Sequence, residues 1–303
     1  MRNSVLLSIS CITYNHAPYI RQCLEGFVMQ KTDFLFEVLI HDDASTDGTA
    51  DIIREYEAKY PEIIKPIYQI ENQWRKGRRG SAVFNFPRVK GKYVAMCEGD
   101  DYWTDPYKLQ RQVDFLEANE DYSMCFHKVK IINDEVNLIT SWYDHLQTKE
   151  YTAEEIMTTW TVPTCSVVFR SSIINNIPNH KDFSMGDNVL FLTCAMYGKL
   201  YCENIVMGEY RRNSGGLTAS FAWKKKIVKH YEALKECFPN VSPDILDNSI
   251  MIYQIEFMMT YIKKLDIISF FRQLIVSLST YKMKFIQVFL QKTKNYVKKH
   301  IEI

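Results

Sequence analysis

The sequence lacks several features that mark broad classes of protein. It has no surplus of charge of one sign, because 37 Lys and Arg residues nearly balance 36 Asp and Glu residues, leaving a net charge of +1. Nucleic-acid binding needs a basic surplus that displaces counterions, so we expect no nucleic-acid partner. No apolar run approaches the ~18 residues that a membrane-spanning helix needs. We therefore do not expect this chain to be an integral membrane protein.

The spacings typical of metal and disulfide frameworks are also missing. The 8 cysteines include no CxxC pair, and the 7 histidines form no HxH or HExxH cluster. Both absences argue against a zinc site. Most of the cysteines lie inside apolar runs, which indicates reduced core residues and a cytosolic protein. The start, MRNSVLLSISCITYN, has serines within its apolar run and no small-x-small cleavage site, so it predicts a buried strand instead of a secretory signal.

Buried strands alternate with helices through the first half of the chain. The predicted strands cover residues 5–12, 36–41, 63–69 and 92–97, and the predicted helices cover 20–28, 50–60 and 109–116. This order implies a largely parallel sheet with helices on both faces. Such a sheet binds its ligands beyond the carboxyl ends of its strands.

The second half is predicted to be more mixed. A capping box at Thr152 and Glu155 predicts the start of a helix. The stretch VPTCSVVF, residues 162–169, is predicted as a strand, and a helix is predicted from Gly186-Asp187 to Gly198. Two further strands, LYCE and IVMGEYRR, are expected to complete the sheet.

The last part of the chain is predicted to be helical. Ser242 is a plausible cap with Pro243 at the first helical position, so we expect one domain over residues 1–238 and a helical extension over 239–303. The extension carries an apolar stripe and a lysine-rich end. We favour packing of the stripe on the first domain, and contact with an anionic membrane surface is the alternative. The stripe consists of Phe271, Leu274, Ile275, Leu278, Phe285 and Val288.

Two acidic clusters follow directly after predicted strands. Asp42 and Asp43 follow the second strand, and the stretch CEGDDYWTDP places Glu98, Asp100 and Asp101 after the fourth. Both clusters therefore fall at the ligand-binding edge of the sheet. Pairs of carboxylates suit Mg²⁺ or Mn²⁺, which usually keep several waters and bridge to substrate phosphates. From these residues alone, a solvated acidic loop explains the second cluster equally well.

Neighbouring residues have plain structural explanations. Residues 45–47 are best explained as caps of the helix that follows them. The basic segment 75–79 is more simply a solvated loop than a clamp on a diphosphate. Tyr102 and Trp103 either stack on a sugar or pin their loop to the sheet, and the sequence does not separate these two roles.

The order of four motifs resembles the inverting glycosyltransferases of family 2, which have the GT-A fold. The motifs are SISCITYNHAPYI, FEVLIHDDASTDGT, KGKYVAMCEGDDYWTDPYKLQRQ and FSMGDNVLF, and the resemblance covers roughly residues 4–215. It implies a Rossmann-like, mostly parallel sheet flanked by helices. It also implies transfer of a sugar from a nucleotide diphosphate, commonly a UDP-sugar, to an acceptor hydroxyl.

The resemblance assigns roles to individual residues of the first two motifs. It places Thr13 and Tyr14 near the donor base. It matches Asp43 with the carboxylate that holds the uracil, with Asp42 beside it.

In the third motif, Glu98-Gly99-Asp100 occupies the family's DxD position. The family binds a divalent metal there, Mn²⁺ or Mg²⁺, together with the ribose and diphosphate of the donor. Asp101 extends this acidic edge. The chain departs from the family pattern because its first acidic residue is Glu, which leaves Asp100 as the main expected metal contact.

The resemblance also implies a catalytic base and an arginine that binds the donor. Asp187, in MGDN, matches the family's catalytic base, although the family often has Glu-Asp where this chain has Gly186-Asp187. Without the resemblance, a carboxylate at a helix start would be explained as a cap. Arg211 or Arg212 precedes the loop that folds over the diphosphate in the family, so we expect one of them to bind the donor.

We therefore expect a cytoplasmic glycosyltransferase with a saccharide acceptor. Many bacterial surface-polysaccharide enzymes of this family use lipid-linked acceptors. If the acceptor of this protein is lipid-linked, the alternative to packing applies, and the enzyme works at the inner face of the membrane with peripheral contact through the C-terminal helices. Two alternatives stay open. One is a nucleotidyltransferase that makes sugar nucleotides, which usually has a glycine- and basic-rich loop where this chain has TYNHAP. The other is a non-catalytic protein that binds nucleotide sugars.

Overall fold

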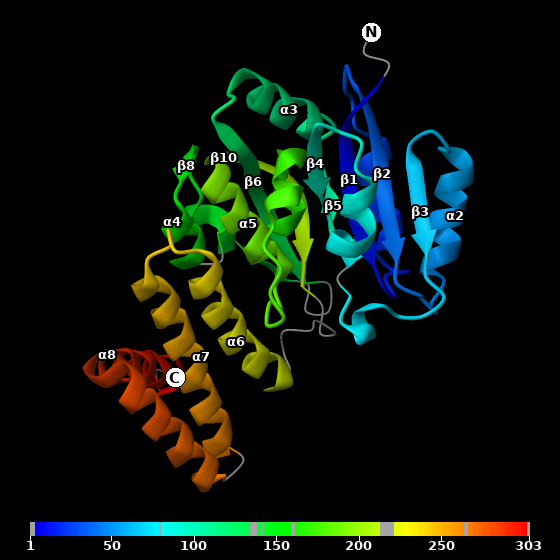
Figure 1. Ribbon diagram of the computed structural model, residues 1–303. Coiled ribbons are helices and arrows are strands. Elements are labelled where there is room, and N and C mark those ends of the chain that lie inside the picture. The colour runs from blue at the N-terminus through cyan, green and yellow to red at the C-terminus, as the bar shows by residue number, and fades with distance from the viewer. Residues whose placement is uncertain are drawn as a thin grey trace. The chain divides into compact units, whose positions relative to one another are not determined.

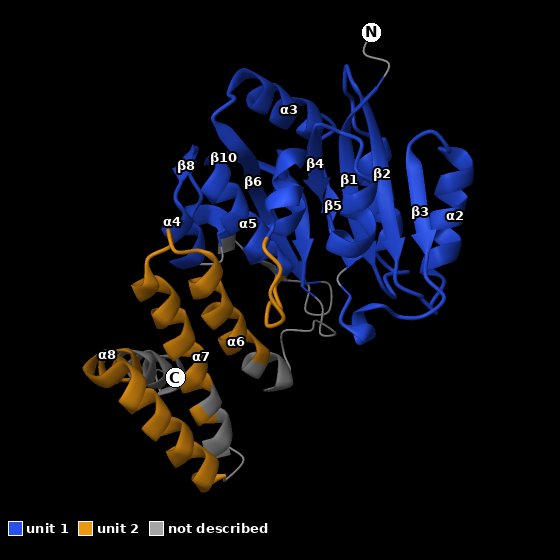
Figure 2. Cartoon of the chain, in the orientation of Figure 1, with its two compact units in different colours: residues 1–177, 186–215 blue, residues 178–185, 216–303 orange. Residues whose placement is uncertain are grey.

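The chain folds into two compact units (Figure 2). Unit 1 comprises residues 1–177 and 186–215, and unit 2 comprises 178–185 and 216–303. The computed structural model describes residues 4–78, 80–133, 138–140, 142–158, 161–212, 221–263 and 266–301. Unit 1 contains the sheet, and unit 2 consists largely of helices.

Ten strands of the described residues form one sheet in unit 1 (Figure 1). Their order is β3-β2-β1-β4-β9-β6-β10-β5, with β7 beside β6 and β8 beside β10. The first four neighbours pair in parallel, as the βαβα pattern predicted. These four strands are β1 (Val5–Thr13), β2 (Leu35–Asp42), β3 (Ile64–Tyr68) and β4 (Tyr93–Met96).

The other half of the sheet is mixed, while most paired residues of the whole sheet are parallel, as predicted. Here β6 and β10 are parallel, but β9 runs antiparallel between β4 and β6, and β5, β7 and β8 are antiparallel to their neighbours. These strands are β5 (Tyr102–Trp103), β6 (Tyr122–Asn133), β7 (Leu138–Thr140), β8 (Lys149–Tyr151), β9 (Val168–Arg170) and β10 (Lys199–Arg211). The three-residue β9 pairs with the four-residue β4 on one side and with β6 on the other. It thereby joins the two parallel groups of strands into one sheet.

Two predicted strand boundaries were wrong. Residues 162–169 do not form one strand, because Thr164–Ser166 is a 3₁₀ turn in which Ser166 donates its backbone N–H (3.0 Å) and its hydroxyl (2.7 Å) to the carbonyl of Pro163. The two strands predicted after Gly198 are a single strand, β10. Its register against β6 shifts between Glu203 and Val206, where we expected a break.

The helices of unit 1 lie close to the predicted positions. The periodic face of α1 is buried, as are the predicted apolar positions of α3. Thr152 and Glu155 form the expected reciprocal capping box at the start of α4. The helices are α1 (Ile20–Val28), α2 (Thr49–Lys59), α3 (Lys108–Ala118), α4 (Ala153–Thr158) and α5 (Gly186–Tyr197). Short turns of helix cover Trp74–Lys76, Ser81–Asn85, Phe86–Arg88, Trp142–His145 and Ser171–Asn176.

Three helices make up most of the part of unit 2 that the structure describes. They are α6 (Phe221–Cys237), α7 (Pro243–Lys263) and α8 (Ile267–Ile301). Pro243 begins α7, as predicted. The unit includes α6, whereas we expected the helical extension to begin at residue 239, and the domain boundary itself stays a prediction. Among the described residues, no helix combines the length and the hydropathy that crossing a membrane requires.

Candidate active site

The carboxyl ends of β1, β2 and β4 meet at one edge of the sheet. Thr13 is the register partner of Asp42, and the N–H of Asp43 donates to the carbonyl of Thr13 at 3.0 Å. The N–H of Gly99 donates to the carbonyl of Ile12 at 2.9 Å. This pairing brings both predicted acidic clusters to the same edge.

Gly99 allows the turn after β4 to lie directly on β1. A Cβ atom at this position would lie 2.6 Å from the hydroxyl oxygen of Thr13 and 2.8 Å from its Cβ. Any other residue would therefore push the acidic loop away from the strand. Thr13 is buried, and its hydroxyl has no hydrogen-bond partner among the residues that the structure describes.

The first acidic cluster has its charge largely satisfied by the protein. The carboxylate of Asp42 accepts the hydroxyl (2.5 Å) and the N–H (3.3 Å) of Ser45, although burial still raises its pKa. The carboxylate of Asp43 accepts the N–H groups of Gln73 at 2.6 Å and Trp74 at 3.1 Å. Asp43 therefore tethers the turn at Trp74–Lys76 to the end of β2, a role that the sequence did not reveal.

The loop after β1 and the loop after β2 are interlocked. Asn15 has a left-handed backbone, with φ 53°, and accepts the N–H of Thr46 at 2.8 Å through its side-chain oxygen. The carboxylate of Asp47 accepts the N–H groups of Ala17 (2.9 Å) and Thr49 (3.0 Å). The N-cap of α2 is Gly48, without a side-chain cap, so the main role of residues 45–47 is to hold the loop that presents Tyr14, a residue that is 37% exposed.

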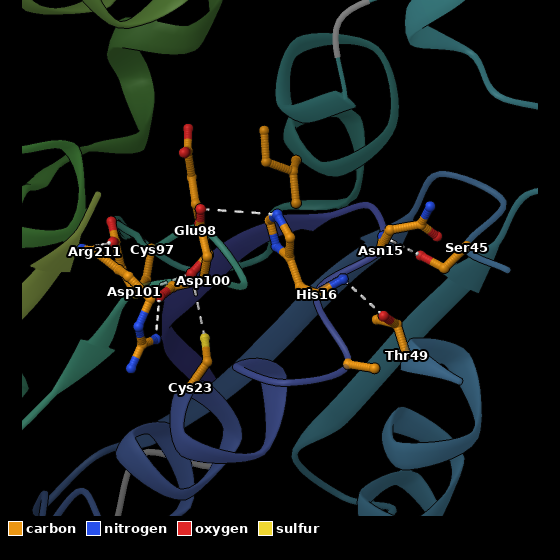
Figure 3. A network of polar contacts seen from close by, with 12 residues as sticks. Asn15, His16, Cys23, Ser45, Thr49, Cys97, Glu98, Asp100, Asp101 and Arg211 are labelled. Atoms are coloured by element: carbon orange, nitrogen blue, oxygen red, sulfur yellow. Dashed lines mark hydrogen bonds and ion pairs between the residues drawn. The ribbon is translucent and has the colours of Figure 1, made fainter. Parts of the chain in front are cut away.

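In the second acidic cluster, residues 98–101 (Figure 3), buried carboxylates lie near other carboxylates. Burial, followed by the charges of Asp100 and Asp187, raises the pKa of Glu98 to about 8. Burial, followed by the charges of Asp100 and Glu98, raises the pKa of Asp101 well above its ordinary value. Burial also raises the pKa of Asp187, against the opposing effect of the Asn188 N–H at 2.8 Å. The charge of Asp187, at the start of α5, therefore adds to the pKa shift of Glu98 in the loop after β4.

His16 and Arg211 reach this loop from opposite sides (Figure 3). The Nε2 atom of His16 lies 3.8 Å from a carboxylate oxygen of Asp100. The sequence analysis missed His16, and its position directly after TYN was the available signal. Sequence alone gave no comparable clue to the contacts that Arg211 makes.

Arg211 is bound by protein groups on several sides. Its backbone N–H donates to the carboxylate of Asp101 at 2.7 Å, and its guanidinium donates to the carbonyl of Asp100 at 2.6 Å and to the side chain of Gln22 at 2.8 Å. The guanidinium carbon lies 4.5 Å from the centre of the Tyr19 ring. Arg211 is buried and joins β10, α1 and the acidic loop, whereas Arg212 is exposed.

Trp103 pins the acidic loop to the body of unit 1. Its indole N–H donates to the carbonyl of Cys165 at 2.7 Å, and its ring meets Phe27 edge to face. Only 1% of its surface is exposed, so of the two roles left open by the sequence the structural one applies. The hydroxyl of Tyr102 donates to the carboxylate of Glu209, which ties the same segment to β10.

The second cluster has the chemistry expected of a divalent-cation site. Raised pKa values at Glu98 and Asp101 mean that the surroundings do not compensate their negative charge, and a bound cation would do so. In the described part of the chain, no three His, Cys, Asp or Glu side chains gather closely enough to hold a metal ion on their own. Glu98 and Asp100 fit a cation that takes its remaining ligands from water and a substrate phosphate.

Two curated relatives cover most of this chain. The uncharacterized protein Rv1520 of Mycobacterium tuberculosis is 34% identical over 215 residues, which is 70% of this chain and 60% of that protein. The Escherichia coli enzyme WfaP is 27% identical over 231 residues, 76% of this chain and 86% of that one. Its name describes a UDP-Glc:alpha-D-GlcNAc-diphosphoundecaprenol beta-1,3-glucosyltransferase. The chain thus spans about 60% of the length of the first relatives that it matches.

Solved structures share the fold at low sequence identity. The structure of Staphylococcus aureus TarS 1-349 in complex with UDP-GlcNAc has a TM-score of 0.62 and 18% identity, covering 82% of this chain and 71% of that one. The mannosyltransferase PcManGT of Pyrobaculum calidifontis, in complex with GDP-Man and Mn²⁺, has a TM-score of 0.59 and 16% identity. The alignment covers 99% of this chain and 89% of PcManGT.

The sequence profile of glycosyl transferase family 2 matches residues 8–177, which carry β1 to β4 and the acidic loop. Together with the sheet described above, this match confirms the resemblance drawn from the four motifs. The chain belongs to glycosyl transferase family 2 and has the GT-A fold.

Proposed function

We propose that this protein is an inverting glycosyltransferase that moves a sugar from a nucleotide diphosphate donor, most simply a UDP-sugar, to an acceptor hydroxyl. One feature carries the proposal: after burial and the charge of Asp100, the carboxylate of Asp187, on α5, also raises the pKa of Glu98, on the loop after β4. A base and a metal-binding loop must lie close together if they act on the same sugar. Membership of the family supports the same assignment.

The donor end of the reaction is assigned to the loops after β1, β2 and β4. Glu98 and Asp100 would hold the cation, and Mn²⁺ in the PcManGT complex supports that choice. A divalent cation bound there supplies a Lewis acid that neutralises the charge growing on the departing diphosphate. Thr13 and exposed Tyr14 line the edge where the nucleobase would bind. We keep the donor-binding role of Arg212, since its side chain is the exposed one of the two arginines.

The remaining donor residues act mainly by holding this edge in shape. Asp42 and Asp43 fix the loops beside the base through the backbone groups that they accept. Asp101 fixes β10 through the N–H of Arg211. Arg211 in turn orients the carbonyl of Asp100, so we assign it a positioning role toward the donor diphosphate.

The acceptor end is assigned to Asp187. Its carboxylate takes the proton of the acceptor hydroxyl while that oxygen attacks the anomeric carbon opposite the diphosphate, which inverts the carbon. A positioned base of this kind typically contributes about 10²–10⁴-fold to the rate. The raised pKa of Asp187 supports the role, because a carboxylate that binds a proton more readily is a stronger base.

The acceptor is proposed to be a saccharide carried on a lipid diphosphate, in the synthesis of a bacterial capsular polysaccharide, exopolysaccharide or lipopolysaccharide. The name of WfaP, with its diphosphoundecaprenol acceptor, supports this class. All 8 cysteines are free thiols, which supports a reducing compartment and hence the cytoplasm.

The proposal is tested by incubating the protein with UDP-sugars, Mn²⁺ and a GlcNAc-diphosphoundecaprenol analogue, and by measuring UDP release above hydrolysis. Turnover that Asp187→Asn abolishes supports the proposal. Release of pyrophosphate from a nucleoside triphosphate would instead identify a nucleotidyltransferase. Metal-independent binding of UDP-sugars without turnover would identify a non-catalytic binding protein.

A further inference from the structure

The helix α8 presents an apolar face that none of the described residues of unit 2 covers. Six of its large apolar side chains are each more than half exposed. They fall into two groups with helical spacing, one on each side of a break at Lys282, where the backbone has φ 47°. The six are Ile267, Ile268, Phe271, Ile275, Met283 and Leu290.

The opposite face of α8 packs against α7 in a hydrophobic core of unit 2. Phe285 is buried with Met251, Ile255 and Met258 of α7. Leu274, Leu278 and Val288, all members of the predicted stripe, pack against this cluster as well. The other two members, Phe271 and Ile275, lie on the exposed face, so the predicted stripe combined residues from two different faces.

The charge of α8 is entirely of one sign. Residues 267–301 contain no Asp or Glu, although acidic and basic residues nearly balance over the whole chain. An isolated solvated helix face usually mixes both signs, whereas an anionic surface selects for cations beside exposed apolar residues. The basic residues of this segment are Arg272, Lys282, Lys284, Lys292, Lys294, Lys298 and Lys299.

We propose that the exposed face of α8 is a docking surface for an anionic lipid bilayer. Phe271, Ile275 and their neighbours enter the interface between headgroups and acyl chains, and basic residues such as Arg272 meet the anionic headgroups. A partner protein with an apolar groove would not require a helix free of acidic residues over its whole length. The inference does not rest on the chemistry of the donor site.

The test is co-sedimentation of the full chain with vesicles. We expect binding to vesicles of phosphatidylglycerol and phosphatidylcholine in equal parts, weaker binding to phosphatidylcholine alone, and release at high salt. The double variant Phe271→Glu/Ile275→Glu changes only exposed positions and should bind at least about tenfold more weakly. Arg272→Gln should weaken binding to the anionic vesicles less.

The matched control is Leu35→Glu, which replaces a 53% exposed apolar residue at the start of β2 in unit 1. It should bind vesicles like the unchanged protein. The proposal is overturned if the unchanged protein sediments with neither vesicle, or if the double variant binds as well as the control. It is also overturned if the double variant changes only the oligomeric state, measured by light scattering, or only the melting temperature. Those results would assign the face to a second copy or to packing within the chain.

Discussion

The two acidic clusters of the site lie at the same edge of the sheet but differ in how their charge is balanced. Asp43 accepts two backbone N–H groups, and Asp42 accepts two groups from Ser45. Burial raises the pKa of Asp42 as well, but for Glu98 and Asp101 the charges of neighbouring carboxylates, Asp100 first, add to the effect of burial. The first cluster therefore holds the loops in place, while the protein does not compensate the negative charge of the second, which a bound cation would do.

The largest effect should come from Asp187, outside both clusters. Asp187→Asn removes the proposed base and should lower turnover of the UDP-sugar by about 10²–10⁴-fold. UDP binding should stay the same, because Asp187 is assigned no donor contact. The measurement is UDP release under saturating donor. An Asn variant with the turnover of the unchanged protein would remove Asp187 from the mechanism.

The first cluster should contribute to the free energy of unfolding. Asp43→Ala leaves the N–H groups of Gln73 and Trp74 without their acceptor, at a cost of about 1–3 kcal/mol in the free energy of unfolding. Urea denaturation measures this change, and Trp74 fluorescence reports release of its turn. An unchanged unfolding free energy, with an unchanged spectrum, would mean that Asp43 does not tether the turn.

The second cluster should destabilise the fold in a pH-dependent manner. Because the pKa of Glu98 rises from 4.5 to about 8 on folding, the folded chain holds a proton that the unfolded chain has lost between these values. The contribution of Glu98 to stability is therefore full below pH 4.5 and falls as the pH rises to about 8. Glu98→Gln should melt increasingly higher than the unchanged protein across this window.

Mn²⁺ supplies the control for that experiment. A cation that compensates the carboxylates should raise the melting temperature of the unchanged protein and narrow its gap to Glu98→Gln above pH 8. Two melting curves that keep a constant separation at every pH would contradict the assigned difference between the clusters.

A smaller effect is expected at Arg211. Arg211→Lys keeps the charge but cannot donate to both the carbonyl of Asp100 and the side chain of Gln22 in the same geometry. Affinity for Mn²⁺ in the presence of UDP, measured by electron paramagnetic resonance, should fall several-fold, which corresponds to the loss of about one hydrogen bond. Arg111→Lys is the matched variant, because this arginine of α3 pairs with Glu203 outside the site, and it should leave Mn²⁺ affinity unchanged. Equal effects of the two variants would contradict a positioning role for Arg211.

Sequence patterns predicted most of the features that depend on neighbouring residues. The parallel half of the sheet, the helix faces of α1 and α3 and the position of the acidic loop follow from local periodicity. The tether from Asp43 to residues 73 and 74 and the bonds of Arg211 do not, because their partners lie about 30 and 110 residues away. The strand predicted over residues 162–169 overlaps β9 but is too long, and the antiparallel direction of β9 was not predicted, since three residues carry little periodicity.

The C-terminal helix shows a related limit. A hydrophobic period identifies residues that share a face, but it does not say which face is buried or where the helix breaks. The break at Lys282 and the packing of Phe285 on α7 decide both questions. We expected the whole stripe to pack on the first domain, but Phe285 packs on α7 within unit 2, and Phe271 and Ile275 are exposed.

The most direct test of the central claim is titration calorimetry of UDP into the protein, first with Mn²⁺ and then with EDTA. The account predicts binding that requires Mn²⁺, disappears in Glu98→Ala/Asp100→Ala, and persists in Asp187→Asn. Binding of UDP that is equally tight with EDTA, or that survives loss of both carboxylates, would show that the second cluster is not the cation and diphosphate site.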